Sequence, residues 1–167
     1  MDANELFTSS MAWLEKYYSC YRFFAERDIV WTLQVHMSQM LEQNPKYRVF
    51  HNHPMGERRS VDLAVLSTNG LVEVAAEFKY EPGHERSGRD IWPTKFPIVL
   101  WPEVEKDVTR TRQFVEQGRA QTAYAILIDE SGYFRKQQIP SGSQWLTWAT
   151  GQSVLWTCFG SDSSQLD

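Results

Sequence analysis

The chain has 167 residues, of which 42% are hydrophobic and 14% aromatic, and its formal net charge is −4. This composition excludes an intrinsically disordered chain and predicts one compact domain with a sizeable core. The acidic balance also excludes a molecule that attracts polyanions over long range, so any contact with nucleic acid has to be local.

The sequence gives no sign of membrane insertion or export. No apolar run approaches the roughly 20 residues of a membrane-spanning helix. The first residues, MDANELFTSS, lack the basic and apolar regions of a signal peptide. We therefore expect a cytoplasmic protein without membrane association.

Residues 5–44 have the pattern of two helices with a break near residues 19–24. The apolar residues of the second helix recur at the three-and-four spacing of a core-facing stripe, namely Val30, Leu33, Met37, Met40 and Leu41. Extended backward, this stripe reaches Glu26. Its carboxylate either lies in solvent near the helix start, where the helix dipole favours an acid, or faces an interior site.

Three strands are predicted next, over residues 47–50, 60–66 and 71–80. The Asn69-Gly70 pair between the last two is a strong hairpin signal. Alternate residues of a strand point to opposite faces, so residues 71–80 separate into two rows. Val72, Val74, Ala76 and Phe78 form an apolar row, whereas Glu73, Ala75, Glu77 and Lys79 form a row that ends in an acid and a base.

The rest of the chain completes an α/β pattern. Residues 81–97 have the composition of an exposed loop, residues 104–117 predict an amphipathic helix closed by Gly118, and residues 122–130 predict a strand in the middle of a sheet. The segment after Gly132 is compatible with a hairpin or with a short helix and a strand. We predict an α/β fold with a mixed central β-sheet flanked by helices.

A lone acid, Asp62, interrupts the strand at residues 60–66, and an antiparallel pairing brings it near Glu77. Two like charges about 4 Å apart repel by roughly 4 kcal/mol at an effective dielectric constant near 20, so such a pair takes up a proton or holds a cation. Mg²⁺ prefers oxygen ligands and needs only one or two protein carboxylates. Lys79, on the same row as Glu77, can then orient a water molecule and offset negative charge on a phosphate.

The segments Val61-Asp62 and Glu77-Phe78-Lys79, preceded by a helical Glu26, resemble the signature of the PD-(D/E)XK nuclease superfamily. The likeness covers about residues 24–130, with valine in place of the proline of the signature. It implies a restriction-endonuclease-like fold, in a single domain that we expect to span residues 1–160. The composition of the last residues predicts a flexible tail at 161–167. The likeness also implies that Asp62, Glu77 and the carbonyl of Phe78 bind Mg²⁺ or Mn²⁺ while Lys79 activates water and Glu26 assists.

Basic residues around this site are candidates for phosphate binding. We expect such contacts from Arg59, His84, Arg86 and Lys95. The alternative is a charged loop in which neighbouring acids, Glu85 among them, neutralise the cations locally. His51 and His53 share a strand face and are able to ligate a metal, although a solvated strand end is the simpler interpretation.

Two functions remain open at the level of sequence. The first is a metal-dependent endonuclease or exonuclease that hydrolyses phosphodiester bonds, for which DNA is the favoured substrate and RNA remains an alternative. The second is a catalytically inactive nuclease-like module that binds a protein partner or nucleic acid in a defence or mobile-element system. A homodimer or an accessory protein is compatible with either function.

Overall fold

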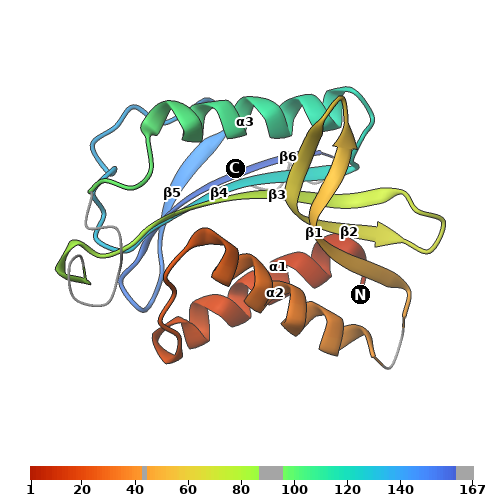
Figure 1. The fold of residues 1–167 in the computed structure, drawn as a ribbon, viewed down its shortest axis with the longest axis horizontal. Helices are drawn as coiled ribbons and strands as arrows, with labels where there is room; N and C mark the ends of the chain where they lie inside the picture. Colours follow the sequence, from red (N-terminus) through yellow and green to blue (C-terminus); the bar gives the residue numbers. More distant parts are fainter. Residues whose placement is uncertain (43–44, 87–95, 161–167) are drawn as a thin grey trace.

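The computed structural model describes residues 1–42, 45–86 and 96–160. Over these residues, three α-helices flank one six-stranded mixed sheet, which confirms the predicted α/β class (Figure 1). The predicted tail at 161–167 lies outside the described residues. No helix in the described part of the chain is both long and apolar enough to cross a membrane.

The helices are α1 (Ala3–Tyr17), α2 (Glu26–Leu41) and α3 (Trp101–Glu116), with short 3-10 helices η1 (Tyr18–Cys20) and η2 (His84–Arg86). The strands are β1 (Tyr47–Gly56), β2 (Arg59–Ser67), β3 (Val72–Glu81), β4 (Thr122–Asp129), β5 (Ser143–Thr147) and β6 (Ser153–Gly160). They lie in the order β1-β2-β3-β4-β6-β5, and only the β3–β4 pair is parallel.

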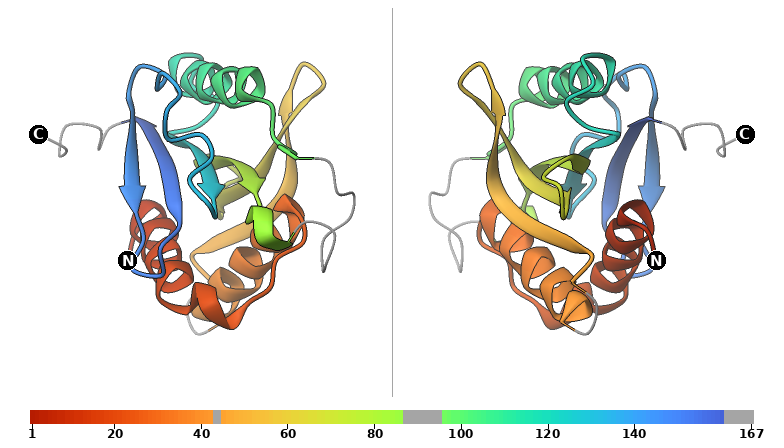
Figure 2. Two further views of the ribbon diagram at one scale, coloured as in Figure 1. Left: turned by 90° about the vertical axis from the view of Figure 1, so that its left-hand side faces the viewer. Right: turned by 90° about the vertical axis from the view of Figure 1, so that its right-hand side faces the viewer.

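Helices α1 and α2 cover one face of the sheet, and α3 covers the other (Figures 1 and 2). The predicted break between the first two helices is confirmed, since η1 and a short extended segment separate them. The predicted stripe on α2 is buried, with Leu33 and Met37 fully enclosed. It packs with Val74, Ala76 and Phe78 of the predicted apolar row of β3 in the largest core cluster. The first residue of that row, Val72, packs on the α3 side instead, because the register shifts between its partner Leu66 and the neighbouring Val65.

The β2–β3 hairpin predicted from Asn69-Gly70 is confirmed. Gly70 adopts a φ of +83°, a conformation that glycine reaches without steric cost. The antiparallel register pairs Leu63 with Ala76 and Leu66 with Val72, so Asp62 stands one residue past the last paired position. At this end the hairpin of β1 and β2 turns away from β3 toward α3 (Figure 1).

Strand β4 is buried along its whole length, as its continuous apolar run predicts. It lies parallel to β3, and α3 is the helix of the connection between them. The C-terminal segment forms a hairpin, β5–β6, whose second strand pairs with β4. The structure thereby decides between the two arrangements compatible with the sequence.

Helix α3 starts at Trp101, three residues before the predicted start at Val104. Pro102 occupies its first turn, where a missing N–H is tolerated because that group has no partner within the helix. The segment before the helix is a connection rather than a strand. The N–H groups of Ile98 and Val99 donate to the carboxylate of Glu81 at the end of β3.

Candidate functional site

A cluster of charged side chains interrupts the packing between α3 and the sheet. Apolar contacts flank it on both sides, with Phe114 and Ala123 in one cluster and Val104 and Leu127 in the other. The charged residues between them are Glu26, Asp62, Glu77, Lys79, Asp107 and Arg110. The structure therefore brings together the four predicted catalytic residues and adds two from α3.

Asp62 lies at the fork where β2 separates from β3. Its Oδ2 accepts the backbone N–H of Phe78 at 2.7 Å, so a side chain replaces the β2 backbone acceptor that continued pairing would supply. The carboxylate is half-buried, and one of its oxygens is engaged by this bond. The bond fixes Asp62 beside Glu77 and Phe78 of β3.

Glu77 is the most deeply buried member of the cluster, with 2% of its surface exposed. Its Oε2 lies 2.8 Å from the guanidinium of Arg110. Its Oε1 is buried and has no hydrogen-bond donor among the described residues. Burial, followed by the charge of Asp62, raises the pKa of Glu77 to about 9, because a proton on Glu77 relieves both penalties.

Lys79 lies at the centre of three oxygen groups. Its ammonium is 3.0 Å from Asp107 Oδ2 and 3.3 Å from Glu26 Oε2, and it donates to the carbonyl oxygen of Phe78 at 3.2 Å. Burial alone would lower the pKa of Lys79, but the charges of Asp107 and Glu26 outweigh burial and raise it. Lys79 is therefore a permanent cation at neutral pH.

Glu26 reaches the cluster from the first turn of α2, on the opposite side of the fork from α3. Burial and the charge of Asp62 raise the pKa of Glu26 to about 7, against the lowering effect of Lys79. Of the two interpretations left open by the sequence, the structure favours an inward-facing carboxylate over one that lies in solvent.

Sequence reasoning missed Asp107 and Arg110. Asp107 falls within the core-facing stripe of α3, between Val104 and Val108 and before Thr111, all of which are buried. An acid at a core position of an amphipathic helix was the available signal. Arg110, one turn later, bridges Asp107 and Glu77 at 2.8 Å each.

The charge balance and the donor set of the cluster fit a hard divalent cation. Four carboxylates face two cations, which leaves a formal charge of −2 when all six groups are ionised. The Asp62 and Glu77 carboxylates and the Phe78 carbonyl are the oxygen ligands that Mg²⁺ and Mn²⁺ prefer. Among residues 1–42, 45–86 and 96–160, no group of three or more His, Cys, Asp or Glu side chains is arranged to hold a metal ion.

Two surface cavities border the cluster. One has a volume of about 400 Å³ and is lined by Glu26 and Asp62 together with residues of α2 and β1. The other, of about 450 Å³, lies along α3 and is lined by Arg59, Lys106 and Arg110, with two polar neighbours. Glu26 and Asp62 thus have an approach from solvent, and Arg110 borders a basic surface. Glu77, Lys79 and Asp107 line a third cavity, of about 10 Å³, between α3 and the sheet.

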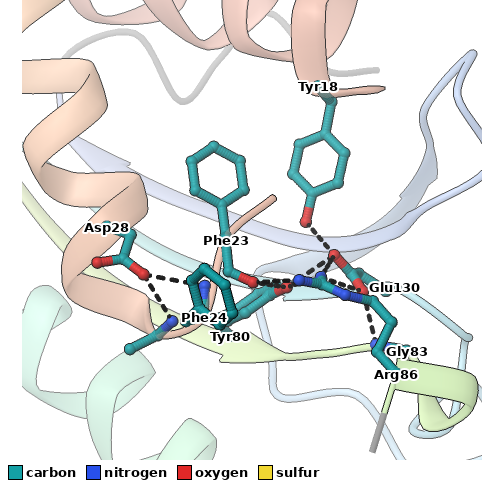
Figure 3. A network of polar contacts seen from close by, with 9 residues as sticks. Tyr18, Phe23, Phe24, Asp28, Tyr80, Gly83, Arg86 and Glu130 are labelled. Atoms are coloured by element: carbon teal, nitrogen blue, oxygen red, sulfur yellow. Dashed lines mark hydrogen bonds and ion pairs between the residues drawn. The ribbon is translucent and has the colours of Figure 1, made fainter. Parts of the chain in front are cut away.

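A separate network of polar contacts holds the chain that leads into α2 (Figure 3). The carboxylate of Glu130 accepts hydrogen bonds from the Tyr18 and Tyr80 hydroxyls and from Arg86, at 2.7 to 2.9 Å. Arg86 also donates to the carbonyl oxygen of Phe23 at 2.6 Å. These contacts fix the segment three residues before Glu26.

The predicted phosphate-binding residues fall in different places. Arg59 lines the basic cavity and donates to Gln113 at 3.0 Å. Arg86 is committed to the Glu130 network, and the ring of His84 stacks on that of Phe96 at 4.2 Å. Lys95 lies outside the described residues. Of the three described residues of this set, Arg59 is the one that borders a cavity beside the cluster.

The fold and the site together define an α/β domain with a buried cluster of carboxylates and cations at a strand fork. Comparison of the chain with protein-family models, curated proteins and solved structures found no match.

Proposed function

We propose that this protein is a metal-dependent nuclease with a restriction-endonuclease-like fold that hydrolyses phosphodiester bonds in DNA. The observation that carries the proposal is the charged cluster in the core beneath α3. Burying several charges costs free energy that apolar side chains in the same place would avoid. Apolar packing on both sides of the cluster therefore supports a chemical rather than a structural reason for it.

Asp62, Glu77 and the Phe78 carbonyl are the residues that would hold Mg²⁺ or Mn²⁺. Such an ion, when bound, supplies a Lewis acid for the phosphate and lowers the pKa of a water molecule. The buried Glu77 Oε1 is suited to this role, since it has no described donor and its pKa is raised by burial and by Asp62. Arg110 already pairs with Glu77 Oε2, and a cation close to Oε1 would further favour the ionised form of Glu77.

Lys79 has the position and charge of an orienting cation. Its permanently protonated state excludes a role as a general base at neutral pH and suits hydrogen-bond donation to water and to negative charge on the phosphate. Glu26 and Asp107 hold the ammonium between them. Arg110 links the same cluster to the basic cavity, where phosphate groups of the strand find partners.

The test is cleavage of single-stranded and duplex DNA and of RNA with Mg²⁺ or Mn²⁺. We expect cleavage by the wild-type protein and its loss in Asp62→Asn, Glu77→Gln and Lys79→Met. Glu73→Gln is the matched control, because Glu73 is a half-buried acid earlier on the same strand. Each variant should unfold cooperatively and keep its far-ultraviolet circular dichroism spectrum.

Cleavage that survives in all three site variants would refute the proposed site, and loss of folding in all three would assign these residues a structural role. Calorimetry gives a measure that is independent of turnover. A heat of Mn²⁺ binding that disappears in Glu77→Gln and persists in Glu73→Gln is the expected result.

One observation favours the second candidate, an inactive binding module. Arg110 and Lys79 already pair with Glu77 and Asp107 at 2.8 and 3.0 Å, so the cluster has internal charge compensation. Such a module predicts no heat of Mn²⁺ binding and no cleavage of any nucleic acid. It predicts instead that Glu77→Gln leaves partner binding unchanged.

A further inference from the structure

The cavity of about 400 Å³ beside Asp62 has features that phosphodiester hydrolysis alone does not require. It extends from Asp62 and Glu26 to an aromatic wall formed by Trp31 of α2 and His51 of β1. Its volume lies within the range of about 300–1,000 Å³ that is typical of small-molecule sites. We propose that this cavity binds an unpaired nucleobase next to the phosphate at the acidic cluster, which makes single-stranded nucleic acid the substrate class.

Trp31 is the principal observation. The side chain is 59% exposed, because α2 packs its apolar stripe against the sheet and Trp31 lies outside that stripe. A large exposed aromatic ring in a cavity is suited to stacking on a base, and such stacking tolerates any base because every base has a π-face. The ring planes of Trp31 and His51 are tilted by 59°, with 5.6 Å between the ring centroids. His51 therefore does not stack flat on the exposed indole, which leaves an indole face open to a base.

The β1 side of the cavity is held in place by hydrogen bonds to α2. Gln34 Oε1 accepts a hydrogen bond from His51 Nδ1 at 2.8 Å, and Gln34 Nε2 donates to the Val49 carbonyl at 3.2 Å, so Gln34 links α2 to β1. Asn52 follows with a φ of +48°, in the left-handed region that few residues other than glycine adopt. This conformation places an exposed residue with an amide side chain at the cavity, on the strand that pairs with β2.

The chemistry of the lining fits a base with polar edges rather than an aliphatic ligand. Asn52 offers both a donor and an acceptor, and Arg27 offers a cation and a planar guanidinium. A duplex base inside its stack cannot reach such a cavity without unpairing. The inference rests on the proposed function for the position of the phosphate, whereas the base-binding surface is independent of the hydrolytic residues.

The test compares binding of short fluorescent oligothymidine, oligouridine and a duplex hairpin, measured by anisotropy at one salt concentration. Binding is measured in chelator, and again with Mn²⁺ in a Lys79→Met background, in which the proposed function expects no cleavage. Trp31→Ala should weaken binding of the single strands by about 5-fold to 150-fold, the equivalent of ~1–3 kcal/mol per stacked base. Trp31→Phe should retain part of the affinity, and the duplex should be the weakest ligand.

Tyr133→Ala is the control, because Tyr133 is also an exposed aromatic residue, at 52%, and lies beyond β4. Single-strand binding that is equal in Trp31→Ala and Tyr133→Ala would overturn the inference, as would tighter binding of the duplex or no binding of any oligonucleotide. If the wild type cleaves nucleic acid while Trp31→Ala binds normally, only the base subsite fails. If Trp31-dependent binding occurs and no metal supports cleavage, only the hydrolase proposal fails.

Discussion

Replacement of Glu77 by glutamine should change how the stability of the protein depends on pH. The pKa of Glu77 is raised from 4.5 to about 9, so between these values the folded state keeps a proton that the unfolded state has released. The folded state then binds more protons, and the free energy of unfolding falls as pH rises. The slope for one group is about 1.4 kcal/mol per pH unit, or roughly 3 kcal/mol from pH 6 to pH 8.

Glutamine has nearly the shape of a protonated glutamate and removes this titration. We therefore expect Glu77→Gln to gain stability relative to the wild type as pH rises, by up to about 3 kcal/mol between pH 6 and pH 8. The assay is urea unfolding followed by tryptophan fluorescence at pH 6, 7 and 8, in chelator. Glu73→Gln serves as the control and should follow the wild type.

Equal pH slopes for the wild type and Glu77→Gln would refute the reasoning, because they would mean that Glu77 is ionised in the folded protein throughout this range. Addition of Mn²⁺ at pH 8 provides a second arm. A ligand that binds only the folded state at 100 times its dissociation constant stabilises it by about 2.7 kcal/mol. The wild type should gain this stability, and Glu77→Gln should gain much less.

Three further predictions concern the surroundings of the cluster. Lys106→Ala, in the basic cavity, should weaken nucleic-acid binding for all sequences and reduce the magnitude of the slope of log K against log salt concentration by about 1. Replacement of the exposed Lys136 by alanine should change neither the binding nor the slope. Arg86→Ala should lower the free energy of unfolding by about 3–5 kcal/mol, since it leaves the Glu130 carboxylate without its cation. Phe114→Ala should lower the free energy of unfolding by about 3–5 kcal/mol, because its ring, on the sheet-facing side of α3, is fully buried, and both stability changes are measured by urea unfolding.

Local patterns were sufficient to predict much of the fold and part of the site. The two rows of β3 follow from alternation alone, and they place Glu77 and Lys79 on the α3 side of the sheet, opposite Phe78. Asn69-Gly70 sets the antiparallel pairing of β2 and β3, which brings Asp62 to the same region. These predictions succeeded because each depends on a spacing of a few residues.

The missed features depend on contacts between distant segments. The role of Arg86 follows from Glu130, 44 residues away, which the sequence does not associate with it. Trp31 was not recognised as a surface feature, although its position outside the buried α2 stripe was visible in the sequence. Asp107 differs from these, because the apolar residues of α3 suffice to predict the helix, and an acid among them does not indicate its partners Lys79 and Arg110.

The fork between β2 and β3 explains why the fold and the candidate site depend on each other. Paired strands would occupy the Phe78 N–H with a backbone carbonyl, in the place that the Asp62 carboxylate takes now. Arg119, which follows α3, donates to the Met55 carbonyl at 2.9 Å and pairs with Glu57 at 2.8 Å, and so holds the end of the β1–β2 hairpin near α3. With β2 turned aside in this way, the Asp62 side chain takes over the bond to Phe78. The same turn places the cavity beside Asp62, so the contacts that shape the hairpin also open the site to solvent.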